Sequence, residues 1–462
     1  MRKAHKFKLP AAAIVAFSFF ILICLGTAVL CLPFATKSGK VDFLNALFTA
    51  TSASCVTGLA VTGMSTYWSY FGQAVILILI QIGGLGFITI MSLFMLYVKK
   101  HTSLSQRKLV MQSAGSVDLV SIKGLVKIIL IGTLIFEFTG AFCLSFAFVP
   151  KYGWGSGIWQ AIFTSVSAFC NAGFTLTDAV TKGGVSGGAS LTDFIGNPLV
   201  NIVIMLLIII GGIGFFVWGD VVHHGIHIKK YSFHSKVVLS TTLGLIVLGW
   251  ALFMAFEWNN PATIGNKGVG TKILSTLFMA VTPRTAGFAT VEYGNMSGAG
   301  NALTMALMLI GGSPGSTAGG LKTTTLAVFV LATLATARRE NEVHLYNRRF
   351  ENDASYQAGA IVCLYILVTV LSTLIICGIE SSHFNWGAGM PSLTEIAFEV
   401  VSAVGTVGLS FGRTGQLHEV SQVLLVLLMF FGRVGGFTLV LIFSGEKKPV
   451  AISRVADKII VG

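Results

Sequence analysis

The stretch LFTATSASCVTGL occupies residues 47–59 of a chain that is otherwise dominated by long apolar runs. It starts with the apolar spacing of a helix, passes into small and hydroxyl residues, and ends at a glycine. It is too short to cross a bilayer, because a span needs about 20 apolar residues. Three more stretches share this design: IFTSVSAFCNAGF (162–174), LFMAVTPRTAGF (277–288) and AFEVVSAVGTVGL (397–409). The pattern predicts one structural unit used four times.

A second motif follows each of these stretches, and it supports the repeat. The copies are IGGLGF (82–87), IGGIGF (210–215), IGGSPG (310–315) and FGRVGGF (431–437). We therefore predict four units of span, half-span, loop and span, covering residues 1–110, 111–225, 226–345 and 346–462. Close helix packing through small residues is the alternative for the second motif. It does not explain four short re-entrant pieces, because non-helical backbone at membrane depth needs a polar lining or surrounding protein.

The composition indicates an all-α integral membrane protein. Of 462 residues, 54% are hydrophobic and 11% are charged, against about 25% charged residues in soluble domains. The first apolar run is longer than the core of a signal peptide, so we expect a retained helix. Eight runs reach spanning length: 11–34, 73–98, 128–149, 198–219, 237–256, 302–336, 358–379 and 420–444. Around one axis, the four units would form a pseudo-fourfold pore.

Positive charge is distributed by membrane side, which argues against nucleic-acid binding despite a formal net charge of +13. With a cytoplasmic N-terminus, the segments predicted to lie inside hold 21 of the 31 Lys and Arg residues, and those predicted outside hold eight. This is the positive-inside asymmetry. It predicts a multi-pass protein of the cell membrane with both termini in the cytoplasm. Three cytoplasmic histidines, His223, His224 and His227, leave either a solvated loop or a metal site open.

The four glycine-ended loops are the candidate ion-binding site. Glycine tolerates positive φ and keeps side chains out of a narrow path, so backbone carbonyls can replace the hydration shell of K⁺. The half-helices present their partially negative C-terminal ends to such an ion. We expect K⁺ at the ring of Gly58, Gly173, Gly287 and Gly408. The filter loops are predicted to comprise Cys55, Val56, Thr57, Gly58, Cys170, Asn171, Ala172, Gly173, Arg284, Thr285, Ala286, Gly287, Gly405, Thr406, Val407 and Gly408.

Two charged residues near these loops need a role. Arg284 would repel a cation if it faced the axis, so we expect it to point backwards and anchor the third loop. Glu399 is either its partner or a local negative charge. Glu137 lies in the middle of a predicted span, as a structural hydrogen-bonding group or a coupling-ion site.

The run 302–336 is too long for one helix across a bilayer of about 30 Å, and GGSPGSTAGGLKTTT lies within it. Proline and glycine predict a break here, in the third unit alone. We expect this loop to form a gate below the filter, held shut by Arg433. The predicted gate comprises Gly311, Gly312, Ser313, Pro314, Gly315, Ser316, Thr317, Ala318, Gly319, Gly320, Lys322 and Arg433.

The loops SCVTGL, FCNAGF, TPRTAGF and GTVGLS, together with GGSPGSTAGGLKTTT, resemble the Trk/Ktr/HKT superfamily of potassium transporters over essentially the whole chain. Eight spans are similar to the Ktr-type membrane subunit. The resemblance implies K⁺-selective uptake, Na⁺ stimulation, a homodimer in the lipid bilayer, and a cytoplasmic ring of nucleotide-binding regulatory subunits. Glycine at position 58 fits the K⁺-selective pattern, whereas serine there is associated with Na⁺. We expect docking on 99–127 and 337–357.

Other function classes fit less well. A solute symporter needs two inverted halves, whereas these units share one polarity. An intramembrane enzyme needs a nucleophile–base pair or a metal pair, and we find neither, so we expect no enzyme. GSTAGGLKT resembles a phosphate-binding loop, but its lysine is one residue late and no strand precedes it; we expect no nucleotide to bind this chain. A Na⁺-permeable or Na⁺/K⁺-cotransporting protein of the same fold remains the alternative.

Overall fold

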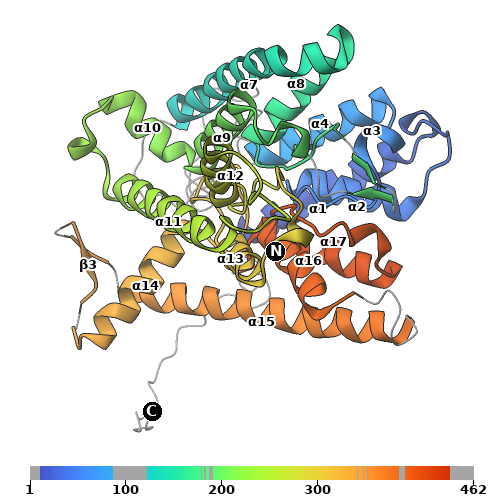
Figure 1. The fold of residues 1–462 in the computed structure, drawn as a ribbon. Coiled ribbons are helices and arrows are strands. Elements are labelled where there is room, and N and C mark those ends of the chain that lie inside the picture. The colour runs from blue at the N-terminus through green and yellow to red at the C-terminus, as the bar shows by residue number, and fades with distance from the viewer. Residues whose placement is uncertain are drawn as a thin grey trace, which may run out of the picture.

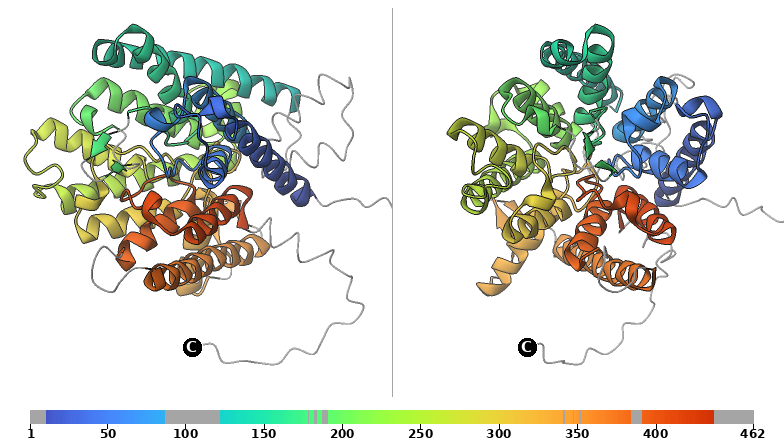
Figure 2. Two further views of the ribbon diagram at one scale, coloured as in Figure 1. Left: turned by 90° about the vertical axis from the view of Figure 1, so that its right-hand side faces the viewer. Right: turned by 45° about the vertical axis from the view of Figure 1, so that its right-hand side comes forward.

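The structure is a computed structural model that describes residues 11–86 and 122–436, apart from 178, 182–183, 187–190, 341, 347, 351 and 384–390. Within these ranges the chain is mostly helical. Figure 1 shows the helices grouped in chain order around a centre, and the right-hand view of Figure 2 looks into that centre. The predicted docking loop 99–127 lies mostly outside the described residues, as do the ends of the predicted spans 73–98 and 420–444.

Among the described residues, four single helices are long and apolar enough to cross a membrane. They are α1 (Ala11–Leu30), α7 (Ile122–Tyr152), α11 (Phe233–Glu257) and α15 (Asn352–His383). Each exposes large apolar side chains on its outer face, for example Phe138 and Leu248. Such a surface is unfavourable in water and expected in lipid. The chain is therefore a multi-pass membrane protein.

A short helix follows each of these spans and runs toward the centre. These are α2 (Phe43–Ser54), α8 (Trp154–Phe169), α12 (Val269–Val281) and α16 (Leu393–Gly405). The local sequence fixes where they begin: Asp42 caps α2, and Ser392 with Glu395 forms a capping box at α16. Their C-terminal halves are almost fully buried. Each therefore ends among the other helices rather than in lipid.

The second helix of each unit returns from the centre, and three of the helices involved end at a glycine with positive φ. They comprise α4 (Tyr70–Leu85), α9 (Pro198–Gly212) with α10 (Phe215–His224), α13 (Gly298–Leu309) with α14 (Thr323–Ala337), and α17 (Glu419–Val434). The terminating glycines are Gly86 after α4, Gly225 after α10 and Gly435 after α17, with φ of 77°, 56° and 91°. A residue with a β-carbon would be strained in this region.

The second unit corrects one prediction. We expected an interruption in the third unit alone, and an unbroken span over 198–219. Instead α9 and α10 are bent by 96° at a short break. The break follows Gly212, whose carbonyl accepts a hydrogen bond from Ser313 N, and the next helix begins with Phe215 N donating to Gly315 O. Contacts with a distant loop therefore replace the helical hydrogen bonds here.

The remaining elements are short connectors. They are η1 (Pro33–Ala35), α3 (Met64–Tyr67), β1 (Ala179–Thr181), β2 (Gly184–Ser186), η2 (Thr192–Phe194), η3 (Ile228–Lys230), η4 (Tyr293–Asn295), β3 (His344–Leu345), β4 (Arg348–Arg349) and η5 (Thr414–Gln416). β1 pairs antiparallel with β2, and β3 with β4. The β3–β4 hairpin lies in the predicted docking segment 337–357 and projects from the body in Figure 1.

Candidate functional site

The four glycine-ended loops share one backbone conformation. Two residues before each glycine, a non-glycine residue adopts positive φ: Val56 at 55°, Asn171 at 57°, Thr285 at 65° and Thr406 at 51°. The glycines that follow also have positive φ, between 71° and 93°. Left-handed backbone at a residue with a β-carbon costs roughly 1–2 kcal/mol. Four such residues at matched positions indicate that the surrounding structure holds the loops in this shape.

The four glycines meet and pack in a closed cycle. A methyl group added to Gly173 would lie 2.9 Å from both Ala286 O and Gly287 Cα. The other three positions are tighter still, and each is occupied by the backbone of the next loop: Gly58 meets Ala172 O, Gly287 meets Val407 O and Gly408 meets Thr57 O. The cycle runs from the first loop through the second, third and fourth and back to the first. A side chain at any of the four glycines would displace the neighbouring carbonyl.

The predicted filter residues are all buried at the end of the short helices. Cys55, Thr57, Cys170, Asn171 and Ala172 have no exposed surface. The same holds for Thr285, Ala286, Thr406 and Val407, and only Val56 at 2% and Arg284 at 6% retain any among the non-glycine loop residues. Side chains thus pack behind the loops. In the described residues, the atoms of the four loops that meet at the centre are carbonyl oxygens and glycine Cα atoms.

A hydroxyl residue behind each loop fixes its shape, and our sequence analysis did not single these residues out. Ser402 O accepts from Val407 N at 2.8 Å, and Ser402 Oγ accepts from Gly408 N at 3.0 Å. Ser52 does the same in the first loop, accepting from Thr57 N and Gly58 N. Ser167 O and Thr282 O accept from the corresponding loop amides. The signal was present: each lies five or six residues before its glycine.

The two charged residues beside the loops point away from the centre. Arg284 extends behind its loop, and its guanidinium donates to Thr242 Oγ1 of α11 at 3.4 Å. Glu399 accepts hydrogen bonds from Ser410 Oγ and from Thr414 Oγ1 and Phe411 N. Glu399 therefore ties its short helix to the segment after the fourth glycine. Arg284 is not among the donors of Glu399 in the described contacts.

The predicted gate loop is ordered by its own hydrogen bonds. Gly311 N donates to Leu321 O at 2.8 Å, which closes the loop at its base. The Ser313 and Thr323 hydroxyls lie 2.8 Å apart, and Ser316 Oγ donates to Ser313 O. Most of its residues, including Ser313, Thr317 and Gly311, are buried. The hydroxyls thus satisfy the backbone that proline and glycine free from a helix.

Residues of all four units meet at this loop. From the second unit, Gly211 O accepts from Thr317 N, and Phe169 O accepts from Thr317 Oγ1 at 3.2 Å. A methyl group added to Gly319 would fall against Thr406 of the fourth filter loop. Arg433 of α17 donates to Thr317 O and also to Gly83 O of the first unit. The loop therefore lies directly against the cycle of glycines.

Lys322 and Arg433 both engage this loop. Lys322 Nζ donates to Ala318 O at 2.8 Å and so closes the end of the loop. The Arg433 guanidinium lies 5.9 Å from the centre of the Phe19 ring. Charged groups at membrane depth are costly unless they are paired with polar groups. Here backbone carbonyls from two units supply that pairing for Arg433.

Glu137 contacts the second loop from behind, and the histidines lie outside this centre. Glu137 is almost fully buried on α7, where its backbone carbonyl accepts from Ser165 Oγ at 2.7 Å and its carboxylate contacts Cys170 Sγ at 3.9 Å. His223 and His224 are the last residues of α10 and His227 follows the helix, with His224 Nδ1 3.2 Å from Asp220 O. Across the described ranges, no group of three His, Cys, Asp or Glu side chains is arranged to hold a metal ion.

Comparison with known proteins bears on this arrangement. The sequence profile of the TrkH family, described as "Cation transport protein", matches residues 5–449. The chain belongs to the TrkH family. This family comprises membrane ion transporters and is not an enzyme family. The resemblance that we drew from the loops is thereby confirmed.

Curated relatives within the TrkH family cover nearly the whole chain. The potassium/sodium uptake protein NtpJ of Enterococcus hirae is 39% identical over 95% of this chain and 94% of its own length. The Ktr system potassium uptake protein B of Bacillus subtilis is 36% identical, covering 93% and 92%. That of Vibrio alginolyticus is 32% identical, covering 100% and 97%.

A solved TrkH structure has the same fold. The potassium transporter TrkH from Vibrio parahaemolyticus matches with a TM-score of 0.71 and 18% identity, over 95% of this chain and 86% of that one. The predicted all-α membrane fold is thus confirmed at the level of the TrkH fold.

Proposed function

We propose that this protein is a channel-like translocation subunit for K⁺ uptake, with its selectivity filter at Gly58, Gly173, Gly287 and Gly408. The observation that carries the proposal is the closed cycle of glycines with positive φ. The carbonyls that precede them belong to Thr57, Ala172, Ala286 and Val407, and they would replace the hydration shell of a cation. The cargo named in the relatives' titles, potassium, supports the choice of ion.

The four-unit organisation is part of this proposal. Units at 1–110, 111–225, 226–345 and 346–462 would give eight spans around one pseudo-fourfold pore. Matched loop conformations support the repeat, since four equal loops would contribute equal ligands. With the positive charge on one side, both termini would lie in the cytoplasm of the cell that expresses the protein.

We propose that the loop 311–320 is the gate. Its contacts with the filter loop and with the carbonyl-bound Arg433 support this role, because a loop held by a few hydrogen bonds can leave without unfolding a helix. Arg433 would also repel cations electrostatically while the loop is closed. Lys322 would stabilise the closed loop through Ala318 O.

Partners are proposed on the relatives' names. Three curated relatives are named as proteins of a "Ktr system", which supports a second subunit on the cytoplasmic side. We propose a nucleotide-binding regulatory ring there, with the β3–β4 hairpin within its docking surface. A homodimer of this chain in the membrane is part of the same proposal, as is stimulation by Na⁺.

A second candidate is transport of both K⁺ and Na⁺. The observation that favours it is the printed name of the relative at 39% identity, a potassium/sodium uptake protein. Both candidates share one filter, so they differ only in the relative affinity of the carbonyl ring for the two ions. Glycine in the first loop favours K⁺.

Flux through purified protein in liposomes tests the function. K⁺ uptake is measured against Na⁺ uptake for the native chain, Gly58→Ser and Gly39→Ser, because Gly39 also has positive φ but has nothing within 4 Å. We expect native K⁺ flux that exceeds Na⁺ flux, a lowered K⁺ preference in Gly58→Ser, and no change in Gly39→Ser. Equal fluxes in the native chain would favour the second candidate. An unchanged preference in a folded Gly58→Ser protein would refute the filter.

A further inference from the structure

The helix α10 lies across the direction of the spans. It is bent by 96° from α9. At 1.5 Å per residue, the 15 residues of α9 rise only about 22 Å, which leaves roughly 8 Å of a hydrocarbon core of about 30 Å. Because α10 runs sideways, it adds almost no height. With Pro198 of α9 placed at the opposite edge of the core, α10 comes within about 8 Å of the near boundary between acyl chains and headgroups. In-plane helices bury an apolar face by about 5–10 Å at that boundary.

One face of α10 is packed against the protein. Trp218 inserts beside Phe136 of α7, with ring centres 5.3 Å apart, and its indole nitrogen donates to Ile210 O at 3.0 Å. Phe215 packs on the same ring. These contacts fix how the helix is rotated. The last turn of the helix, residues 221–223, is left without protein contacts that bury it.

That last turn and the turn after it carry exposed apolar side chains. Val222 is 62% exposed, and Ile226 and Ile228 are 91% and 61% exposed. Ile226 follows Gly225, whose φ of 56° ends the helix and projects the turn outward. Ile226 is the most exposed large apolar side chain among the described residues. Several exposed apolar side chains so close together are unfavourable in water.

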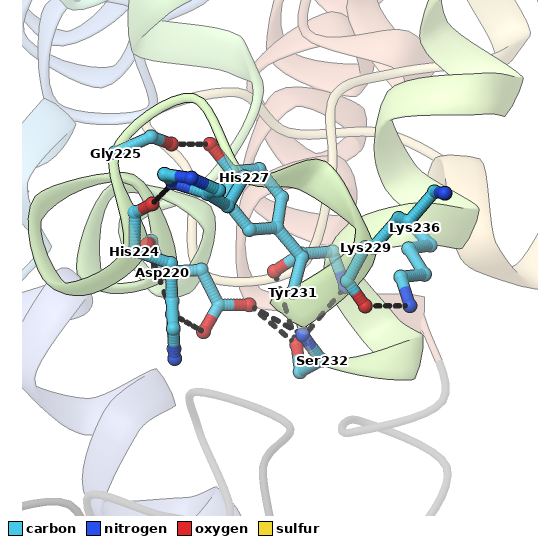
Figure 3. A network of polar contacts seen from close by, with 9 residues as sticks. Asp220, His224, Gly225, His227, Lys229, Tyr231, Ser232 and Lys236 are labelled. Atoms are coloured by element: carbon cyan, nitrogen blue, oxygen red, sulfur yellow. Dashed lines mark hydrogen bonds and ion pairs between the residues drawn. The ribbon is translucent and has the colours of Figure 1, made fainter.

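Basic residues border these exposed apolar side chains. A network of hydrogen bonds orders the turn that carries them (Figure 3). Asp220 accepts from Ser232 N at 3.0 Å and Ser232 Oγ at 2.6 Å, and Lys236 Nζ donates to Lys229 O at 2.8 Å. Lys229 and Lys230 are exposed beside the isoleucines. Three lysines against one aspartate give residues 220–236 a formal excess of positive charge.

We propose that α10 and the turn 225–230 form a lipid-binding surface for anionic headgroups on the inner leaflet, with Ile226 and Ile228 inserted among the acyl chains and Lys229 and Lys230 at the phosphates. The side assignment rests on the orientation in the proposed function. The apolar residues match the acyl-chain layer of a membrane, and the flanking lysines match its headgroup layer. Each lysine contributes about 1 kcal/mol to binding anionic lipid.

Depth favours lipid over a soluble partner or a second copy of the chain. Only eight residues separate the end of α10 at His224 from the start of the span α11 at Phe233, so the turn is held close to the membrane at both ends. The helix packs on α7, whose own outer face is lipid-exposed at Phe138. The apolar surface of α10 is thus continuous in depth with lipid rather than with the cytoplasm.

Fluorescence quenching by brominated lipids tests this surface directly. A bimane label is placed at Ile226→Cys in full-length protein lacking the exposed Cys24 and Cys363, reconstituted in nanodiscs. Leu248→Cys in α11 is the lipid-exposed control, and Lys267→Cys in an exposed loop is the aqueous control. We expect quenching at Ile226 by bromines placed near the headgroup. Quenching no greater than at Lys267, or disulfide cross-linking between two copies through Ile226→Cys, would overturn the proposal.

A second experiment tests whether Lys229 and Lys230 give the surface a preference for anionic lipid. With brominated phosphatidylglycerol against brominated phosphatidylcholine, the double variant Lys229→Gln/Lys230→Gln is expected to lose anionic preference by about 30-fold, from ~1 kcal/mol per lysine. Lys37→Gln/Lys40→Gln, two exposed lysines in another loop, is the matched control and is expected to keep it. Equal preference in both variants would overturn the headgroup assignment. Quenching does not depend on ion flux, so a failed filter proposal leaves this result readable.

Discussion

Replacing Gly173 by alanine separates the two reasons why a glycine stands in a filter loop. Its φ is 71°, so alanine would be strained by roughly 1–2 kcal/mol. Its new methyl group would also lie 2.9 Å from Ala286 O and from Gly287 Cα. Real contacts of this kind begin above 3.0 Å, so the third loop must move by a few tenths of an ångström. The carbonyl that moves is a proposed K⁺ ligand.

Gly39 offers a matched control because its φ is also 71° while nothing lies within 4 Å of the position of a methyl group. Gly39→Ala should therefore lower thermal stability by the strain alone and leave transport unchanged. Gly173→Ala should show the same strain and, in addition, a K⁺ over Na⁺ preference lowered about tenfold, equivalent to ~1.4 kcal/mol. The shift of one carbonyl out of four is the reason for this loss.

The assay pairs thermal unfolding of the purified variants with K⁺ and Na⁺ fluxes in liposomes. Unfolding reports the strain in both variants, and the flux ratio reports the ring. If Gly173→Ala folds and keeps the native flux ratio, the carbonyls around Gly173 do not select the ion, and the reasoning fails. A Gly408→Ala variant, whose methyl group would meet Thr57 O more closely, should be affected more strongly than Gly173→Ala.

Three other changes give distinct outcomes. Ser402→Ala removes the hydroxyl that accepts from the fourth filter glycine, so unfolding free energy should fall by about 1 kcal/mol, and an unchanged melting temperature would show the bond to be dispensable. Arg433→Gln should raise K⁺ leak through protein without its regulatory partner, whereas Arg413→Gln, in an ion pair with Glu395 at 3.0 Å, should not; equal leak in both would contradict the gate. Gly214→Ala would strain a φ of 94° and place a methyl group 2.7 Å from a carbonyl of the gate loop, so gating should change at native ion selectivity; unaltered gating in a folded variant would disconnect α10 from the loop.

The centre of the molecule was accessible from sequence because its determinants are local. Each filter loop carries its own glycine, its own short helix and its own hydroxyl residue, so spacing alone indicates where the loops lie. The positive φ of the last loop residue requires glycine, so the glycine itself marks each loop in a single sequence. The general composition of the helix ends, which are rich in small and hydroxyl residues, does not distinguish Ser402. Only its distance of six residues from Gly408 marks it.

The break between α9 and α10 was not accessible in the same way. Residues 198–219 form an unbroken apolar run whose proline, Pro198, stands at its start rather than at the break, and IGGIGF differs by one residue from the motif of the first unit. What ends α9 is a pair of hydrogen bonds to a loop about 100 residues later, from Ser313 N and to Gly315 O. Glycine at position 214 permits the bend, but the distant loop causes it. The hydrophobic pattern of residues 198–219 carries no information about a hydrogen-bonding partner so far along the chain.

The cycle of glycines also has a consequence for how the protein is made. Its last contact joins Gly408 to the backbone of the first loop at Thr57, and Arg433 bonds to Gly83 across a separation of 350 residues. During synthesis the first three units emerge and insert before the fourth exists. The first loop therefore has no fourth-unit backbone packed against Thr57 until ribosomes have finished nearly the whole chain. Premature termination anywhere before the fourth unit leaves an open, unsealed assembly that quality-control proteases can recognise.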